Sequence, residues 1–399
     1  MDTPADATIR RESGFDFRPR TRVIFGPGCV EQVGQIASEL SARRILLVTD
    51  PGIVRAGHAK RVTTLLEERK LEVACFDLVE ENPGTSCVAK CLEVARAAEV
   101  DAIVGLGGGS SMDTAKGCNF ILTNGGRIRD YWGVGKAKKP MLPLIAIPTT
   151  GGTGSECQSF ALITDEATHQ KMACGDPKAA ARVAILDPAL TVSQPPRVTA
   201  CSGIDAISHA VETAVTRART TLSLMYSREA FRLTMAAFPR VMKSPGDIEA
   251  RGWMLLGAAW AGTAIENSML GAAHSAANPL TAHFGTPHGQ AVGLMLPHVV
   301  RLNSQDPASA QTYYEMACAV QLAHPSTSHP AAADSLASGL EGLLSLTPLS
   351  RRINAADDLT RRIPALAAEA AQQWTAQFNP RPVSVSDFEQ LYQQVLNHR

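Results

Sequence analysis

The stretch DAIVGLGGGSSMDTAKG, residues 101–117, decides how this chain folds. It begins with a short apolar run that predicts a buried strand, passes through Gly107, Gly108 and Gly109, and continues into a helix-like segment. Glycines at such a junction leave backbone N–H groups bare at a helix N-terminus, where a pyrophosphate can bind. The triplet matches neither GxGxxG nor a Walker A loop, so a tight connection without a ligand remains an alternative.

Other short apolar runs alternate with helix-like segments through the first half of the chain. This alternation predicts an α/β fold with a largely parallel sheet covered by helices on both faces. After about residue 196 the strand signals nearly vanish and apolar residues take helical spacing. The runs with strand character are RILLVTD (44–50), EVACFDLV (72–79), MLPLIAIPTT (141–150) and RVAILDP (182–188).

The paired prolines of SQPPRVTA, at 193–200, suggest a domain boundary. We therefore expect a polar tail at 1–14, an α/β dinucleotide-binding domain at 15–196 and an α-helical metal-binding and catalytic domain at 197–399. A chain of 399 residues is long enough for two such domains.

Composition narrows the classes of partner. Lys plus Arg and Asp plus Glu both total 38, which leaves no net charge to attract nucleic acid or an anionic membrane. No stretch approaches the roughly 20 apolar residues of a membrane span. The nine scattered cysteines suggest neither a disulfide framework nor a zinc ribbon and fit a reducing cytoplasm. A small molecule is the expected partner.

Two further features strengthen the expected phosphate site. The loop IPTTGGTGSE, at 147–156, offers the hydroxyls of Thr149, Thr150, Thr153 and Ser155 at the same edge of the sheet. Asp50 ends an earlier strand, where its carboxylate can accept a hydrogen bond from an adenosine ribose and repel a 2′-phosphate. A helix N-cap explains Asp50 equally well.

A second set of residues suggests a metal. Asp205 and His209 stand four apart in GIDAISHAVE, so a helix presents both on one face. His274 lies in a small-residue helical run, and His288 sits between Pro287 and Gly289 at an expected turn. Three imidazoles and a carboxylate suit Fe(II), Zn(II) or Co(II) and leave room for a substrate oxygen. Any one of these histidines alone would be interpreted as a packed or capping residue.

The motifs GGGSSMDTAK, IPTTGGTGSE, GIDAISHAVE and the segment from His274 through TPHG to LPHV resemble those of the iron-containing, or group III, alcohol dehydrogenases. The resemblance runs from about FGPGCV (25–30) to NPRPVS (379–384). It implies a Rossmann-like NAD(P) domain, an all-helical metal domain of the dehydroquinate synthase-like fold, a cleft between them and commonly a homodimer. It also implies reversible hydride transfer between an alcohol and the nicotinamide, with the metal acting on the substrate oxygen.

Carried over to this chain, the resemblance places the metal ligands at Asp205, His209, His274 and His288. It favours NAD over NADP through Asp50, and Fe(II) ahead of Zn(II). The implied or candidate cofactor contacts are Asp50, Gly107, Gly108, Gly109, Ser110, Asp113, Thr149, Thr150, Thr153, Ser159 and Lys171.

The chain departs from the family pattern at the expected catalytic cleft. Many members have a histidine, proposed to relay the proton, where this chain has Asn278, which is neither acid nor base. We expect the proton to leave through ribose hydroxyls and water rather than through His283. Ile265 stands where a Phe is frequent, and Glu266 where a small residue is, so we assign both to the substrate pocket. A solvated helix position is the alternative for Glu266.

Two other functions stay open at this point. One is an NAD- and metal-dependent lyase of the dehydroquinate-synthase kind, although no cluster of Lys and Arg for an acidic substrate accompanies the ligands. The other is a non-redox binding protein that keeps the fold without the chemistry.

Overall fold

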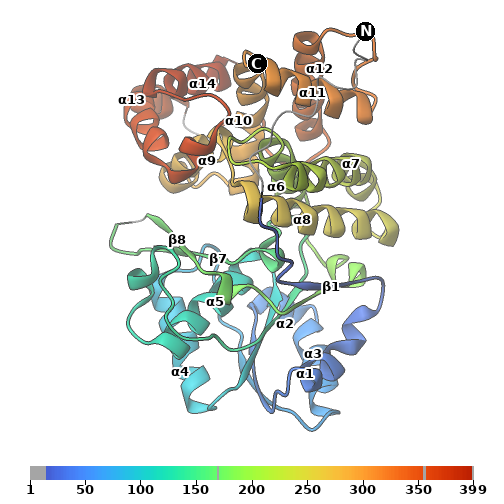
Figure 1. The fold of residues 1–399 in the computed structure, drawn as a ribbon, viewed down its shortest axis with the longest axis vertical. Helices are drawn as coiled ribbons and strands as arrows, with labels where there is room; N and C mark the ends of the chain where they lie inside the picture. Colours follow the sequence, from blue (N-terminus) through green and yellow to red (C-terminus); the bar gives the residue numbers. More distant parts are fainter. Residues whose placement is uncertain (1–14, 169, 354–355, 398–399) are drawn as a thin grey trace.

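The computed structural model describes residues 15–168, 170–353 and 356–397; the expected polar tail at 1–14 lies outside them. The chain forms two lobes stacked along its long axis, an α/β half and a helical half, with helices α6 and α8 at their junction (Figure 1). The expected α/β plus all-α fold is thereby confirmed. Within the described residues, no helix is both long and apolar enough to cross a bilayer.

A six-stranded parallel sheet forms the centre of the α/β half. Its strand order is β1-β9-β6-β4-β2-β3, so the glycine-rich stretch 101–117 begins on an inner strand. The five predicted runs all form strands of this sheet, and β1 adds an unpredicted edge strand. The strands are β1 (Arg22–Phe25), β2 (Arg44–Val48), β3 (Glu72–Phe76), β4 (Ala102–Gly107), β6 (Leu144–Pro148) and β9 (Val183–Leu186).

Helices cover both faces of this sheet, as predicted. Successive residues of β2 alternate between two cores: Leu46 and Val48 pack with helices α4 and α5, whereas Ile45 and Leu47 pack with α1 and α3. Burial on both faces explains why these strands are continuously apolar. The helices of this half are α1 (Val33–Glu39), α2 (Pro51–Arg55), α3 (His58–Glu67), α4 (Thr85–Ala97) and α5 (Gly109–Asn124).

A second, three-stranded sheet was not predicted. Strand β8 pairs with β7 in antiparallel fashion and with the two-residue β5 in parallel fashion. The alternating burial of β7 places one face on the core and the other toward solvent. These strands are β5 (Gly133–Val134), β7 (Phe160–Thr164) and β8 (Lys171–Gly175); short 3₁₀ helices lie at η1 (Cys29–Gln32), η2 (Ile128–Tyr131), η3 (Ser155–Cys157), η4 (Pro177–Ala179), η5 (Pro188–Thr191) and η6 (Trp374–Phe378).

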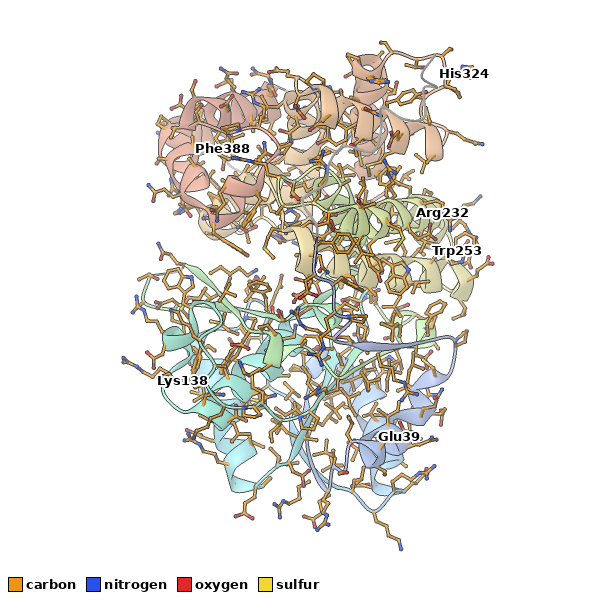
Figure 2. All side chains as sticks on the ribbon, in the orientation of Figure 1. Glu39, Lys138, Arg232, Trp253, His324 and Phe388 are labelled. Carbon is orange, nitrogen blue, oxygen red and sulfur yellow. The ribbon has the colours of Figure 1, made fainter. Side chains whose placement is uncertain are left out.

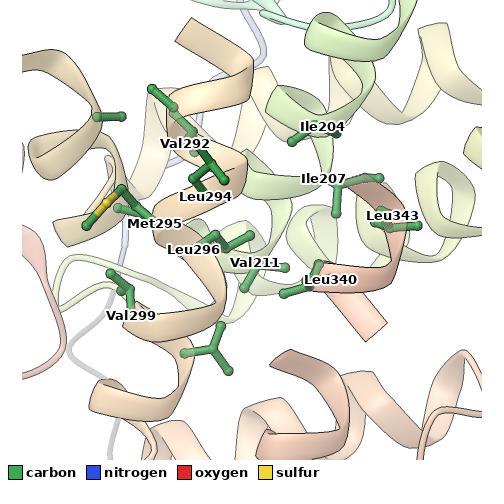
Figure 3. Packing of buried hydrophobic residues seen from close by; sticks show 14 of the residues in the cluster. Ile204, Ile207, Val211, Val292, Leu294, Met295, Leu296, Val299, Leu340 and Leu343 are labelled. Carbon is green, nitrogen blue, oxygen red and sulfur yellow. The ribbon is translucent and has the colours of Figure 1, made fainter. Parts of the chain in front are cut away.

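The second half of the chain is helical throughout its described residues. Helix α6 opens it at Pro196, and we propose the domain boundary at that point. Ile204, Ile207 and Val211 of α6 join Val292 and Leu296 of α10 in one apolar cluster (Figure 3). The helices are α6 (Pro196–Thr213), α7 (Thr221–Lys243), α8 (Ile248–Ser268), α9 (Ala272–Phe284), α10 (His288–Asn303), α11 (Pro307–Ala319), α12 (His329–Ser345), α13 (Ala356–Gln372) and α14 (Val385–Asn397).

The loop after β6 joins the two halves through glycines. A Cβ placed on Gly152 would lie 2.5 Å from the Cβ of Ser202 on α6, and one on Gly154 would lie 2.6 Å from the Cα of Gly262 on α8. Gly154 also has a φ of +63°, which favours glycine. Because any larger side chain would force the backbones apart, these glycines allow the loop to touch both helices.

Figure 2 shows the described side chains on both halves of the chain. Glu39 and Lys138 lie on the outside of the α/β half, and His324 lies at the far end of the helical half. Phe388 of α14, by contrast, is fully buried in the helical core. The candidate site residues lie elsewhere, near the junction of the halves.

Candidate metal centre and cofactor site

Helix α6 presents Asp205 and His209 on one face, as their spacing predicted. Ile204, Ile207 and Val211 occupy a different face and pack into the helical core (Figure 3). This packing fixes the rotation of the helix, so the Asp205 and His209 side chains keep a single direction. Both are buried, at 5% exposure each.

The other two predicted ligands converge on the same carboxylate. Oδ1 of Asp205 lies 3.4 Å from Nε2 of His209, 3.4 Å from Nε2 of His274 and 3.8 Å from Nε2 of His288. The rings of His209 and His274 are stacked with centroids 4.8 Å apart. Residues from α6, the first turn of α9 and the first residue of α10 therefore meet around one point.

The chemistry of this donor set fits a divalent cation. Oδ1 of Asp205 and Nε2 of His274 are buried, and neither has a hydrogen-bond partner. Their 3.4 Å separation exceeds that of a normal hydrogen bond. Asp205, His209 and His274 each offer one ligand atom within 4.8 Å of the others. His288 completes the set from a position that keeps 26% of its side chain exposed.

The electrostatics of the cluster are dominated by burial and by its two acids. Burial lowers the pKa of His288 to about 3. At His274 burial acts in the same direction, but the charges of Glu212 and Asp205 outweigh it and raise the pKa to about 9. At Asp205 burial favours the neutral acid, yet the surrounding histidines lower its pKa overall. Burial likewise lowers the pKa of His209, so the pocket favours an anionic Asp205 beside a protonated His274 and two neutral imidazoles.

The sequence did not predict Glu212, which contacts His274 on the side of the imidazole that faces away from Asp205. Its Oε2 contacts Nδ1 of His274, and its Oε1 accepts a hydrogen bond of 2.7 Å from the amide of Ala273. The signal was available, because Asp205, His209 and Glu212 follow one another at i, i+4 and i+7 on one helix face. Glu212 is not itself a predicted ligand, so the spacing of the ligands alone does not indicate it.

The glycine turn of the predicted phosphate site forms the joint between β4 and α5. Residues 111–121 of α5 are buried, whereas Gly108, Gly109 and Ser110 at its N-terminus are partly exposed. The amide-rich end of a long helix therefore opens outward at the carboxyl edge of the sheet, where a pyrophosphate can reach it.

The loop at 147–156 lies against this turn. The amide of Thr149 donates to the carbonyl of Gly107 at 2.9 Å, and a Cβ on Gly108 would lie 3.4 Å from Thr150. A Cβ on Gly109 would come within 2.7 Å of Cγ2 of Thr153. The predicted glycines and threonines thus form one surface.

Asp113 lies beneath this surface. It accepts a hydrogen bond of 3.1 Å from Ser155, whose hydroxyl in turn accepts one of 2.9 Å from the buried Lys116. Burial raises the pKa of Asp113 to about 6, although the nearby Lys116 and Lys171 oppose this. Asp113 is therefore part of a buried polar network.

Asp50 acts as the N-cap of α2, the alternative that its sequence context suggested. Its Oδ1 accepts hydrogen bonds from the amides of Gly52, at 2.8 Å, and Ile53, at 3.1 Å. Its other oxygen faces the glycine turn, 3.2 Å from where a Cβ on Gly107 would lie. One carboxylate oxygen is therefore used by the fold, and the other points to the expected cofactor site.

Lys171 reaches the glycine turn from the small sheet. Its Nζ donates to Oδ1 of Asn82 at 3.1 Å, and the amide of Asn82 donates to the hydroxyl of Ser110 at 3.3 Å. Asn82 was not predicted; its φ of +52° is a left-handed conformation that asparagine tolerates in turns. The ENPG context was the signal that could have indicated it.

The similarity of this chain to known proteins shows the family to which it belongs. The family profile "Iron-containing alcohol dehydrogenase" matches residues 19–188, and "Fe-containing alcohol dehydrogenase family, C-terminal" matches residues 199–396. The NAD-dependent methanol dehydrogenase of Bacillus methanolicus is 33% identical over 396 residues, which cover 95% of this chain and 99% of that protein. The chain belongs to the iron-containing alcohol dehydrogenase family.

Other members are similar in sequence and in structure. Alcohol dehydrogenase 4 of Schizosaccharomyces pombe is 39% identical over 284 residues, 71% of this chain and 67% of that protein. A crystal structure of a 1,3-propanediol oxidoreductase superimposes with a TM-score of 0.92 at 29% identity, covering 96% of this chain and all of that one. These relatives favour a metal-dependent alcohol dehydrogenase or aldehyde reductase over a lyase.

In this alcohol dehydrogenase the two residues assigned to the substrate pocket have different surroundings. Glu266 is not a solvated helix residue: its side chain is only 11% exposed and forms an ion pair with Arg20. The amide and the hydroxyl of Ser159 both donate to it, at 2.9 and 2.7 Å. Both hydrogen-bond donors of Ser159 are therefore used by Glu266. These bonds hold the two side chains to each other rather than to the metal ligands. Ile265, its neighbour on α8, is buried.

The residue in place of the family's histidine is held by another side chain. Nδ2 of Asn278 donates to Oε1 of Gln373 at 3.1 Å. His283 contacts Glu369 at 2.7 Å and Arg362 at 3.1 Å, both on α13. Because its imidazole is engaged with that helix, the structure gives His283 no position beside the ligands.

Proposed function

We propose that this protein is an NAD-linked, divalent-metal-dependent dehydrogenase that interconverts an alcohol with an aldehyde or ketone. The observation that carries the proposal is the convergence of His209, His274 and His288 on Oδ1 of Asp205, in a chain whose glycine turn opens at the sheet edge. Fe(II) is the expected metal, and Zn(II) the second choice.

The two parts of the site lie within electrostatic reach of each other. Lys171, which contacts Asn82 beside the glycine turn, acts through its charge on Asp113 in the α/β half. It also acts on His288 in the helical half, whose pKa is lowered mainly by burial and further by that charge. This shared neighbour supports a single cleft bordered by the cofactor loops and the ligands.

The assignment of roles follows from these positions. Asp205, His209, His274 and His288 would hold the metal, while Gly107, Gly108, Gly109 and Ser110 would bind the pyrophosphate through amides and a hydroxyl. Thr149, Thr150, Thr153 and Lys171 would border the remaining cofactor, and the free oxygen of Asp50 would accept a ribose hydroxyl and disfavour NADP. When bound, the metal supplies a Lewis acid for the substrate oxygen and the nicotinamide supplies the hydride acceptor.

The proton released on alcohol oxidation must leave the site without passing through Asn278. Oxidation of an alcohol by NAD gives a carbonyl, NADH and one proton. Asn278 donates to Gln373 and has no titrating group. We therefore assign proton release to cofactor ribose hydroxyls and water, with Ile265 as a candidate pocket residue.

Two further properties belong to the proposal. A homodimer is expected from the family resemblance, with the edge strand β1 as one unpaired side of the sheet. A cytoplasmic location is expected because all nine cysteines are free thiols. Light scattering during gel filtration tests the first, and fractionation of the source cell tests the second.

The function is tested by loading the protein with Fe(II) or Zn(II) and measuring NADH absorbance with alcohols, diols and hydroxy acids, using NAD and NADP in parallel. We expect reduction of NAD with at least one alcohol and a loss of at least about 1,000-fold in Asp205→Ala, since metal catalysis supplies several kcal/mol. Wild-type protein that binds metal yet gives no NADH with any substrate class would contradict the proposal.

A further inference from the structure

Glu212 contacts the Nδ1 side of the His274 imidazole and leaves the Nε2 side free to bind a metal. An ionised carboxylate can only accept hydrogen bonds, so its contact with Nδ1 makes that nitrogen the N–H donor. Nε2 is then the nitrogen that faces Oδ1 of Asp205, 3.4 Å away, and the one that can release its proton to bind a metal. The tautomer that can ligate a metal is the one that Glu212 selects.

The same carboxylate also fixes the backbone that carries His274. Its second oxygen accepts from the amide of Ala273, which is otherwise an unpaired donor in the first turn of α9. The neighbouring Gly271 makes room, because a Cβ there would lie 3.1 Å from Oε1 of Glu212. One side chain thus sets both the position of the helix end and the rotation of the imidazole.

Glu212 is itself held firmly. It is 3% exposed and lies on the face of α6 that carries Asp205 and His209. Asp205, His209 and Glu212 are therefore carried by one helix, and Glu212 connects that helix to His274 on α9.

We propose that Glu212 is the positioning residue of the metal centre: it selects the ligating tautomer of His274 and increases the affinity of the site for a divalent metal. This inference rests on the proposed function. Carboxylates behind ligating histidines typically change metal affinity by about 10- to 100-fold when replaced.

Asn379 provides a matched control within the chain. It is 1% exposed and, like Glu212, accepts a hydrogen bond in the first turn of α9, from the amide of Ala272 at 3.2 Å. Its other bonds go to Asn303 and to the carbonyl of Arg381, whereas Glu212 alone contacts the imidazole. Loss of Asn379 therefore weakens the helix end without changing the tautomer.

The test compares wild type, Glu212→Gln and Asn379→Ala in the metal-free form. Zn(II) affinity is measured by competition with a chromophoric chelator, Co(II) binding by visible absorption, and stability by urea unfolding. We expect Glu212→Gln to weaken Zn(II) binding by about 10- to 100-fold and to alter the Co(II) spectrum. Asn379→Ala should lose stability and yet bind Zn(II) within about threefold of wild type.

The outcomes separate the inference from the function on which it rests. Equal Zn(II) affinity of wild type and Glu212→Gln, or an equal loss in both variants, would overturn the role of Glu212. Failure of the wild type itself to bind either metal would instead overturn the proposed function. If Glu212→Gln does not fold, Glu212→Asp, which withdraws the carboxylate by one methylene, is compared with Asn379→Ala by the same criteria.

Discussion

Glu266 and Ser159 form a paired hydrogen bond across the junction of the two halves. The amide and hydroxyl of Ser159, just before β7, both donate to the carboxylate of Glu266 on α8, and Arg20 adds an ion pair at 2.6 Å. This carboxylate ties the small sheet, the helical half and the N-terminal segment together. It therefore belongs to the framework that keeps the halves aligned.

Glu266→Ala should lower the free energy of unfolding by about 2 kcal/mol, because it leaves buried donors on Ser159 without an acceptor. Urea unfolding measures the change. Glu39→Ala is the control, since the Arg22–Glu39 pair lies at the surface with side chains 58% and 45% exposed and should contribute nothing measurable. An equal effect in both variants would contradict the role of Glu266 at the junction.

Gly109→Ala should weaken cofactor binding. Its Cβ would lie 2.7 Å from Cγ2 of Thr153, so the loop must move away from the N-terminus of α5. We expect the NADH dissociation constant, measured by fluorescence titration, to rise about tenfold, or 1.4 kcal/mol. Gly342→Ala, where a Cβ meets no atom within 4 Å, should bind NADH as wild type does. Unchanged affinity in Gly109→Ala would argue against this turn as the cofactor site.

Glu156→Gln should change how stability depends on pH. Glu156 is 1% exposed, and burial raises its pKa from 4.5 to about 7, with Lys116 opposing. The folded state therefore holds a proton that the unfolded state releases near pH 4.5, and wild-type stability falls as pH rises from that value to about 7. The variant lacks this loss and should gain up to about 3 kcal/mol over wild type above pH 7. Urea unfolding across this range, with the exposed Glu72→Gln as control, tests the difference; a gain that does not grow with pH refutes it.

Asn278→His should keep or raise turnover. An imidazole at this position can carry a proton, whereas the wild-type amide only bonds to Gln373. Steady-state rates at saturating NAD measure the effect, with Asn278→Ala separating loss of the Gln373 bond from gain of the imidazole. A fall in turnover of Asn278→His below that of Asn278→Ala would speak against a relay position.

His283→Ala should leave turnover within about twofold of wild type, because its contacts with Glu369 and Arg362 lie on α13 rather than at the ligands. The pH–rate profile should also keep its shape. A large loss of activity, together with the disappearance of a group titrating near neutrality, would identify His283 as the proton carrier after all.

Features with strong local patterns were predictable from the sequence. The buried runs of β2, β4 and β6 are continuously apolar, and Asp205 and His209 carry the spacing of one helix face. The small sheet was missed although β7 reads FALIT, because this apolar run is only five residues long and its partner β8 begins with the exposed Lys171 and ends in Gly175. The contacts of Glu266 were not predicted because its partners, Ser159 and Arg20, stand 107 and 246 residues away. Such pairs depend on tertiary packing, which no local pattern specifies.

The glycines at 152 and 154 have a consequence for how this enzyme can diversify. The loop that borders the expected cofactor also bears the contact with α6 and α8, so a substitution there alters ligand contacts and the alignment of the halves together. Asp50 contributes to the fold only locally, since its capping bonds reach only Gly52 and Ile53 at the start of α2. A change of coenzyme preference at Asp50 therefore costs at most the cap of one short helix and leaves the alignment of the halves intact.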